Sequence, residues 1–460
     1  MISRLLLGLT LASMATPLLA KPLTIPPLKY HQRVLPNGLQ VLSIVDHSSP
    51  VVSVQVWYHV GSKDDPQGRS GFAHLFEHLM FKSTKHMKAE EMDRLTEDVG
   101  GANNASTGDD ITNYFEVVPS NHLETLLWAE ADRMAYLTVD QANFKSERAV
   151  VEEEYRQSVL AQPYGRFFNA LDAKSYRVHP YKRPTIGSIP ELEAASLQDV
   201  LDFHRTFYRP DNATLIVVGD FEPAQLKAWV DQYFGDIKKP DSAIPQVTAV
   251  EPAWKKDRSY TVRAPDVPLP AVAVTWLAPP AASKDAAALR VASALLGRGD
   301  SSRLYQALVY HGQQAAQLGF EADLRKDKGL LVAYAIVAHG KSPAKVRDAM
   351  LAQVNTLMKE PIDAGELAKV KTQLLTSALE RRQTAMGKGF AIGQATLLEG
   401  DPSNVNSDLE DLQAVTAADV QRVLKQYVGN THHVTITYLA EAAKPATAAT
   451  AAAATKGATP

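Results

Sequence analysis

The stretch VVSVQVW at residues 51–57 decides the fold, because it returns later in the chain together with its surroundings. Its apolar residues alternate as in a β-strand, and the stretch AVAVTW at residues 271–276 has the same pattern. The positions of the two tryptophans, Trp57 and Trp276, differ by 219. Each strand is followed by a Ser-Lys-Asp triplet and then by a helical pattern. This repetition indicates a duplicated unit.

A second pair of segments repeats at the same distance. The segment YRPDN at residues 208–212 precedes an apolar strand at 213–218, and YVGN at 427–430 precedes a strand at 434–438. The strands come in groups and do not alternate strictly with helices, which favours sheets that are mostly antiparallel. We therefore predict an α+β fold made of two homologous units, each an antiparallel-rich sheet backed by helices.

The domain organisation follows from these repeats and from the composition of the remaining segments. We place the units at residues 21–237 and 260–440, with a proline-containing linker at 238–259. Residues 1–20 carry one basic residue, an 11-residue apolar run and a small residue at the end, as in a secretory signal peptide. A membrane anchor needs about 18 apolar residues, so that alternative is disfavoured. Residues 441–460 are mostly Ala and Thr, and we expect a disordered tail.

Composition restricts the classes of function. The 460 residues carry a net charge of −3, which gives no general attraction to nucleic acid, and we expect no nucleic-acid partner. Cysteine is absent, which excludes disulfides, thiol nucleophiles and Cys-ligated zinc. After signal cleavage we expect no integral membrane segment. A bacterial-type signal leads first to the periplasm, so we expect a periplasmic protein, with an extracellular location as the alternative.

The most informative motif is HLFEH at residues 74–78. On a helix, His74 and His78 are one turn apart on one face, and Glu77 lies beside them. Two imidazoles on one face can bind one zinc ion, while a neighbouring carboxylate can reach a water on that metal. The motif is the inverted form of the His-Glu-x-x-His zinc motif. The alternative is a buried helix whose histidines fall four residues apart by chance.

A third ligand is available on a helix predicted over about 141–160. Within it, Glu147 and Glu154 are two turns apart and share a face, whereas Glu152 and Glu153 point elsewhere. Spacing alone does not choose among the four glutamates. A solvated acidic helix face is the alternative for all of them.

Motif and glutamates together resemble the pitrilysin and insulysin family of inverted-motif zinc peptidases, and within it the shorter branch that includes mitochondrial processing peptidase. The similarity covers nearly all of the mature chain. In that family the third ligand is a Glu downstream of the second His at a separation near 76, in a segment shaped like Glu-Arg-x-Val-Val-x-x-Glu. Here residues 147–154 read ERAVVEEE, and the positions of His78 and Glu154 differ by 76. The resemblance implies that Glu154 is the third ligand and Glu147 an accessory carboxylate of the catalytic site; an ordinary surface glutamate is the alternative for Glu147.

The resemblance also implies a substrate-binding strand. Residues 100–107, running into 110–115, resemble the family strand beside the zinc, whose exposed edge pairs with an extended substrate. Asn104 and Ala105 match the positions that flank the substrate. A Gly-Gly turn followed by a routine edge strand is the alternative. The segment HPYKRP at 179–184 also matches the family, and we interpret it as a structural loop without ligands.

The second unit lacks this chemistry. A shift by 219 maps His74, Glu77, His78 and Glu154 onto Ser293, Leu296, Gly297 and Gln373. None of these four residues can rebuild a zinc site. The C-terminal unit is therefore expected to form a wall of the substrate chamber, and the two units together one half of a clamshell-like chamber.

The expected partner follows from a departure from the family pattern. Family members often carry an Arg and, seven residues later, a Tyr that hold substrate opposite the zinc, and the matching positions here are Val309 and Ala316. Arg303 and Tyr310 are also seven apart but fall elsewhere in the alignment. We expect a heterodimer in which a paralogous subunit supplies the Arg/Tyr clamp, with a homodimer as the alternative.

The predicted function is that of a zinc-dependent endopeptidase acting on short or unfolded peptides, with one Zn²⁺ per chain. Zinc lowers the pKa of bound water towards about 7, and Glu77 is the expected general base. One alternative is a non-catalytic structural or assembly subunit with the same architecture. Another is a dedicated maturase that trims one peptide precursor.

Overall fold

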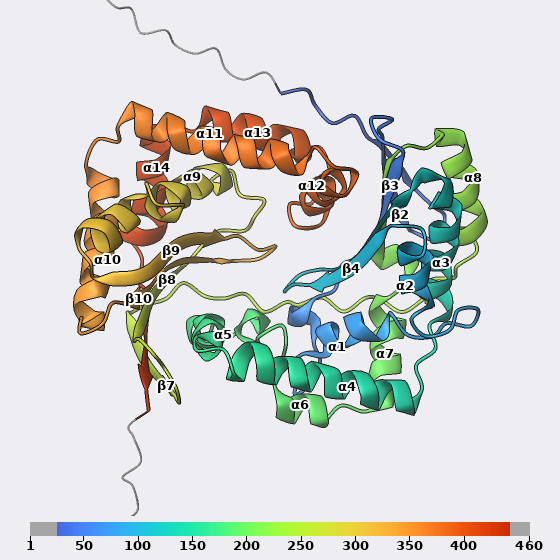
Figure 1. Cartoon of the computed structure of the whole chain (residues 1–460), viewed down its shortest axis with the longest axis horizontal. Coiled ribbons are helices and arrows are strands. Elements are labelled where there is room, and N and C mark those ends of the chain that lie inside the picture. The colour runs from blue at the N-terminus through green and yellow to red at the C-terminus, as the bar shows by residue number, and fades with distance from the viewer. Residues whose placement is uncertain (1–24, 442–460) are drawn as a thin grey trace, which may run out of the picture.

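The computed structural model of the chain describes residues 25–441 as two lobes that lie side by side (Figure 1). The predicted signal peptide, and the predicted tail after Glu441, lie outside the described residues. The first lobe is built from β1 (His31–Val34), β2 (Gln40–Val45), β3 (Val51–Tyr58), α1 (Phe72–Leu79), α2 (Glu91–Glu97), β4 (Ala102–Thr107), β5 (Thr112–Pro119), α3 (Leu123–Tyr136), α4 (Gln141–Tyr155), α5 (Gly165–Ser175), α6 (Ile189–Glu193), α7 (Leu197–Phe207), β6 (Ala213–Gly219) and α8 (Pro223–Phe234). The second contains β7 (Arg258–Ala264), β8 (Ala271–Leu277), α9 (Ala286–Gly297), β9 (Ala315–Asp323), β10 (Leu330–Val337), α10 (Pro343–Lys359), α11 (Ala364–Arg381), α12 (Ala385–Leu397), α13 (Asn404–Ala414), α14 (Ala417–Leu424) and β11 (Val434–Ala440).

Apart from the additional edge strand β1 in the first sheet, the two sheets have the same topology, which confirms the predicted α+β fold of two homologous units. The first sheet has the order β1-β2-β6-β3-β5-β4, and the second has the order β7-β11-β8-β10-β9. In each sheet one pair is parallel, β2 with β6 and β7 with β11, and the other pairs are antiparallel. Strand β9 therefore corresponds to β4, and both are edge strands.

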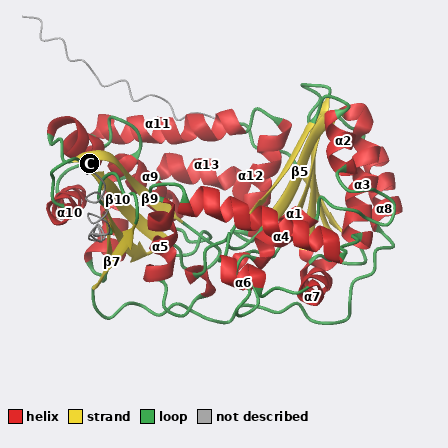
Figure 2. Ribbon diagram, turned by 60° about the horizontal axis from the view of Figure 1, so that its bottom comes forward, coloured by secondary structure: helices red, strands yellow, loops and turns green. Residues whose placement is uncertain are grey.

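The alternation of the 51–57 stretch separates the two faces of the first sheet. Val52, Val54 and Val56 are fully buried in the core under the helices of the first lobe. Trp57 is buried on the opposite face. In Figure 2, helices α3 and α8 lie on one side of this sheet and α12 lies on the other.

Two helices are exchanged between the lobes, a feature that sequence reasoning missed. Helix α12 of the second unit covers the inner face of the first sheet, where Phe390 packs edge-on against Trp57 at 5.3 Å between ring centroids. Helix α5 of the first unit covers the second sheet, where Phe167 contacts Tyr438 at 5.6 Å. The predicted linear boundaries at 237 and 260 stay predictions, although residues 236–257 form neither helix nor strand.

A charged network joins the two equivalent hairpin turns. Asp109 and Asp110 lie in the β4–β5 turn, and Arg325 lies in the β9–β10 turn. The guanidinium of Arg325 is 3.2 Å from Asp109, and the backbone N–H of Lys326 donates to Asp110 over 3.0 Å. Tyr181, in the segment interpreted as a structural loop, donates its hydroxyl to Asp110 over 2.6 Å. Edge strand β4 is thereby fixed against the second lobe.

Candidate metal centre

Helix α1 places its histidines through the pattern of its apolar residues. Phe72, Leu75, Phe76 and Leu79 are buried in the core of the first lobe. Because a helix turns by about 100° per residue, the same pattern directs the polar side chains of the motif away from the core. The predicted helix over the motif is therefore present, with its polar residues half-buried.

The start of α1 is held by a buried carboxylate that sequence reasoning missed. Asp65 accepts hydrogen bonds from the backbone N–H groups of Gly71 and Ala73, each over 2.8 Å. Gly71 has φ +91°, and a Cβ there would lie 2.7 Å from the carbonyl oxygen of Ile186. Only glycine fits this turn without strain. Asp65 lies in the Ser-Lys-Asp-Asp run before the helix, where an N-cap signal could have been sought.

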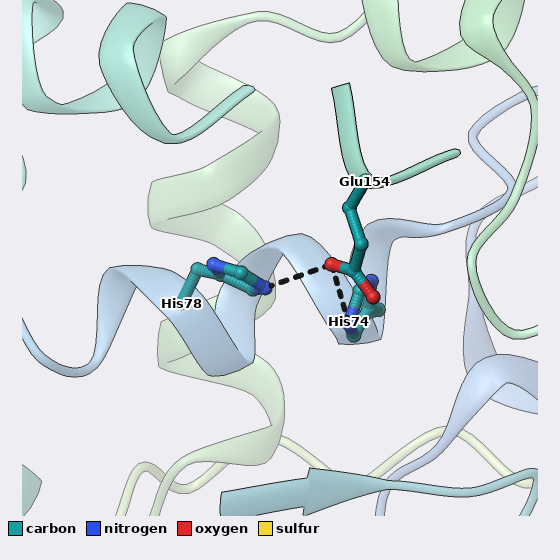
Figure 3. Close-up of side chains that lie close together, drawn as sticks. All are labelled: His74, His78 and Glu154. Atoms are coloured by element: carbon teal, nitrogen blue, oxygen red, sulfur yellow. Dashed lines mark ion pairs between the residues drawn. The ribbon is translucent and has the colours of Figure 1, made fainter. Parts of the chain in front are cut away.

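The three predicted metal ligands converge from two helices. Glu154 on α4 places its Oε2 atom 3.6 Å from Nε2 of His74 and 3.5 Å from Nε2 of His78 on α1 (Figure 3). One potential ligand atom from each residue lies within 4.8 Å of the other two. Glu152 and Glu153, which spacing could not separate from Glu154, instead form ion pairs with arginines on their own helix.

This donor set suits a zinc ion. Two imidazole nitrogens and one carboxylate oxygen are the ligands of a known class of catalytic zinc sites, which keep a further position open. Zinc needs neutral imidazole, and burial, followed by the nearby His78, lowers the pKa of His74 to about 4. The side chain of Glu154 is 43% exposed, so the centre is open to solvent on the carboxylate side. The residues present therefore fit the metal that the sequence predicted.

Glu77 stands beside this group and is held by the edge strand. The hydroxyl of Thr107, at the end of β4, donates a hydrogen bond to Oε2 of Glu77. Burial raises the pKa of Glu77, although the hydrogen bond from Thr107 acts in the opposite direction. A carboxylate with a raised pKa binds a proton more readily than one in water, and the role of Glu77 as general base stays a prediction. Thr107 was missed as a functional residue, because its contact spans 30 positions of sequence.

Glu147 lies behind His78 and does not join the three converging atoms. Its Oε2 atom is 3.7 Å from Nδ1 of His78, and its Oε1 atom is 3.0 Å from Nζ of Lys82. Its side chain is only 9% exposed, which argues against an ordinary surface glutamate. Burial would raise its pKa, but the hydrogen bonds and charges of His78 and Lys82 outweigh burial and lower the pKa. Lys82 was not singled out by the sequence.

Asn104 and Ala105 lie in the middle of β4, the edge strand beside the candidate centre. Asn104 is opposite Phe115 and Ala105 is opposite Tyr114 across the β4–β5 pair. Within residues 25–441, no strand pairs with the other edge of β4. This free edge, reaching from Ala102 to Thr107, is the surface that the sequence predicted for an extended substrate. Direct substrate contact of Asn104 and Ala105 stays a prediction.

Replacing Asp65 by Ala is expected to destabilise the protein. The two backbone N–H groups at the start of α1 lose their acceptor, at about 1–3 kcal/mol for each buried donor left unpaired. Urea unfolding of the metal-free protein measures this loss, and Asp98→Ala on the exposed end of α2 is the control.

The same variant tests the pKa of Asp65, which burial raises to about 7. Because the folded protein binds this proton more tightly than the unfolded chain, protonation of Asp65 favours folding fully below about pH 4, the pKa of the unfolded chain. That contribution declines as the pH rises and is lost above about pH 7. The stability difference between wild type and Asp65→Ala should therefore be largest near pH 4 and shrink towards pH 7. A difference that grows over this range would contradict the assignment.

Replacing Glu147 by Gln is expected to weaken metal binding about 10–100-fold, the usual cost of losing a partner that orients a ligand histidine. The amide keeps the size of the side chain but removes the charge that faces His78 and Lys82. Competition with a zinc chelator measures the affinity. Glu153→Gln, a substitution on the exposed face of the same helix, should leave the affinity unchanged. Complete loss of the metal would make Glu147 a ligand itself.

Comparison with known proteins agrees with this geometry. Residues 40–189 match the family described as "Insulinase (Peptidase family M16)", and residues 194–374 match "Peptidase M16 inactive domain". The chain is 32% identical over 417 residues to the "Zinc protease PqqE" of Helicobacter pylori, covering 89% of this chain and 92% of that protein. It is 25% identical to the "Probable mitochondrial-processing peptidase subunit beta, mitochondrial" of Arabidopsis thaliana, covering 86% of this chain and 75% of that protein.

Solved structures show the same fold. The crystal structure of a protease from Helicobacter pylori superposes with a TM-score of 0.85 at 30% identity, covering 90% of this chain and all of that chain. The periplasmic protease PqqL from Escherichia coli gives a TM-score of 0.73 at 18% identity, but the match covers only 48% of that longer chain.

The fold and the site are those of one half of an inverted-motif peptidase, with a single group of histidines and a glutamate that could hold a metal among residues 25–441. The chain belongs to the M16 peptidase family, and within it resembles the β-subunit of mitochondrial processing peptidase. This confirms the family predicted from the HLFEH motif. The match named "inactive domain" runs from Ala194 in the first unit to Leu374 in the second, and it includes Ser293 and Gly297, which replace the histidines. No helix among residues 25–441 is long and apolar enough to cross a membrane.

Proposed function

We propose that this protein is a zinc-dependent endopeptidase that hydrolyses short or unfolded peptides and forms the zinc-bearing subunit of a two-subunit enzyme. The observation that carries the proposal is the convergence of His74, His78 and Glu154 beside the half-buried carboxylate of Glu77. Names of relatives support zinc as the metal, since several are zinc proteases.

The chemistry follows from the roles that these side chains can take. His74, His78 and Glu154 would hold the zinc, which when bound polarises a peptide carbonyl and lowers the pKa of water to about 7. Glu77 accepts the proton of the attacking water and then delivers it to the departing amine. Thr107 fixes the orientation of Glu77 through its hydrogen bond. Each of these groups comes from a helix or strand of the first lobe, which favours a rigid site.

The substrate class follows from the free edge of β4. A peptide that adds a strand to this edge must be extended, so folded proteins are excluded unless they expose an unfolded segment. Main-chain hydrogen bonds supply affinity that is largely independent of sequence. Because Thr107 at the end of β4 contacts Glu77, a peptide on this edge brings its backbone to the base.

A paralogous partner is proposed because this chain lacks a free substrate clamp. The guanidinium of Arg303 already makes two hydrogen bonds, of 2.9 and 2.7 Å, to Glu366, and so is not available to substrate. Val309 and Ala316 occupy the clamp positions. The match to about half of the Escherichia coli chain supports a chamber made of two such halves. A homodimer is the alternative.

A periplasmic location is also part of the proposal. The Escherichia coli neighbour is described as a periplasmic protease, which supports this location.

The test combines metal content with peptide cleavage. We expect the purified protein to contain about one zinc per chain, and cleavage of an unstructured peptide to stop after removal of the metal by a chelator and return when zinc is restored. The assay is run with the chain alone and after co-expression with a paralogue that carries the Arg/Tyr pair; greater activity of the pair supports the heterodimer. If the chain co-expressed with its paralogue neither contains zinc nor cleaves peptide, the proposal is wrong and the chain is a non-catalytic structural or assembly subunit.

A further inference from the structure

A cavity of about 630 Å³ opens on the inner face of the first sheet, beside the free edge of β4. Its walls come from β4, β5, the turn between β2 and β3 and the start of α12, and include Asp46, Ala102, Asn104, Phe115, Val117 and Met386. The three ligand residues and Glu77 are not among its walls. The cavity is therefore separate from the candidate metal centre, although both adjoin the same strand.

The cavity exists because α12 covers only part of the sheet. Thr384 caps the helix by accepting a hydrogen bond from the backbone N–H of Gly387 over 3.0 Å. From there the helix runs across the sheet over β3 and β6, and Phe390 packs against Phe115 at 4.9 Å between ring centroids. Phe115 stays half-buried at the cavity, and Met386 leaves 37% of its surface exposed. Apolar surface is thus left uncovered next to the edge strand.

The pleat of β4 directs a paired peptide towards this cavity. Asn104 lies opposite Phe115 and Ala102 lies opposite Val117, and residues directly opposite each other share a face of the sheet. A strand added to the free edge of β4 continues the pleat, so every second side chain points to the same face. The peptide side chains that lie beside Asn104 and Ala102 would enter the cavity.

We propose that this cavity is a specificity subsite that takes an apolar side chain of the bound peptide. The proposal rests on the proposed function, because it needs a peptide paired with β4. Its apolar walls, Phe115, Val117 and Met386, would bury an aromatic or aliphatic side chain. The carboxylate in its lining, Asp46, is already paired with Lys388 and would repel an acidic side chain of the peptide. The subsite adds side-chain selection to main-chain binding that is otherwise largely independent of sequence.

The direction of β4 places the subsite on one side of the cleaved bond. Strand β4 runs from the cavity at Ala102 to the contact of Thr107 with Glu77. Antiparallel pairs are the more frequent kind, and an antiparallel peptide runs from Glu77 towards the cavity. Asn104 and Ala102 precede Thr107 by three and five residues, or about 10–17 Å of extended chain. The selected side chain therefore lies about three to five residues C-terminal to the cleaved bond.

Unstructured peptides with a single Phe in an otherwise Gly, Ser and Ala sequence test this inference. Mass spectrometry locates the cleaved bond relative to the Phe. We expect the preferred bond to lie three to five residues before the Phe, with kcat/KM about ten- to a hundredfold higher than for a peptide with Asp at that position. A preference on the N-terminal side, or for a residue adjacent to the cleaved bond, would overturn the assignment, as would equal cleavage of the Phe and Asp peptides.

Two variants and a matched control address the cavity directly. Ala102→Trp fills it from the exposed edge strand, and Met386→Ser removes an apolar wall. Both should reduce the Phe-over-Asp ratio towards one. Val34→Ser removes a 64% exposed apolar side chain at the opposite edge of the same sheet and should leave the ratio unchanged. An unchanged ratio in Ala102→Trp would overturn the proposal.

A binding measurement separates this inference from the proposed function. The Glu77→Gln protein, with its paralogue where that is required, is titrated with fluorescent Phe and Asp peptides. Tighter binding of the Phe peptide that Ala102→Trp abolishes supports the subsite even if no peptide is cleaved. If the wild-type protein is an active peptidase and the Glu77→Gln protein binds both peptides equally, the subsite is overturned and the proposed function is not. Absence of binding to either peptide overturns the subsite as well.

Discussion

Replacing Glu77 by Gln is expected to lower kcat about 10²–10⁴-fold while the zinc stays bound. The amide keeps the shape of the side chain and can still contact Thr107, but it cannot accept the proton of the attacking water. His74, His78 and Glu154 are unchanged, so metal content should stay at about one ion per chain. Single-turnover cleavage of an unstructured peptide measures the rate, and elemental analysis measures the metal.

The matched control for this variant is Glu97→Gln, at the exposed end of α2. It removes the same charge from the same lobe and should leave kcat unchanged. If Glu77→Gln keeps full activity, Glu77 is not the base. If it loses zinc in proportion to activity, the carboxylate acts as a ligand. Thr107→Val offers a milder test, since loss of one orienting hydrogen bond should reduce kcat without changing the metal content.

Local patterns in the sequence were sufficient for the repeated architecture and for most of the site. The alternation in 51–57 and its return at 271–276 correspond to β3 and β8, and the two sheets share one topology. The HLFEH spacing places both imidazoles on one face of α1, because that depends only on helix periodicity. Glu154 needed the family resemblance, since four glutamates on one helix are equivalent by spacing until their neighbours are known.

What the sequence did not reveal depends on contacts between distant segments. The exchange of α5 and α12 is a matter of which sheet each helix covers, and the periodicity within a helix does not state which sheet that is. Lys82 and Thr107 acquire a role only through the side chains they meet, Glu147 and Glu77. The cavity beside β4 likewise arises where α12, a helix of the second unit, begins over the sheet of the first unit.

The arrangement of the lobes explains why one copy of a duplicated unit carries the site. In the second lobe, the counterpart of α1 is α9, where Gly297 packs so closely that a Cβ would lie 2.2 Å from the backbone nitrogen of Phe320. A histidine there would displace β9. Gln373 on α11 stands where α4 has its candidate ligand, Glu154. The second copy therefore has close packing where the first has its polar centre, and close packing suits a wall of the chamber.

Removing the carboxylate of Glu154 is expected to abolish activity by releasing the metal. Glu154→Ala leaves two imidazoles on α1 with no third protein ligand, which is fewer than the three that catalytic zinc sites use. We expect the zinc affinity, measured by competition with a chelator, to fall by more than the 10–100-fold typical of losing an outer partner, and peptide cleavage to fall below detection at zinc concentrations that saturate the wild type.

Glu153→Ala is the decisive control, because Glu153 is the adjacent residue on α4 and its side chain is 56% exposed. It points to Arg156 and lies outside the three converging residues, so metal content and activity should both stay at the wild-type level. If Glu154→Ala retains stoichiometric zinc, the third ligand is a different group. Loss of zinc in Glu154→Ala but not in Glu153→Ala would separate the ligand from its neighbour on the helix, a distinction that helical spacing could not make.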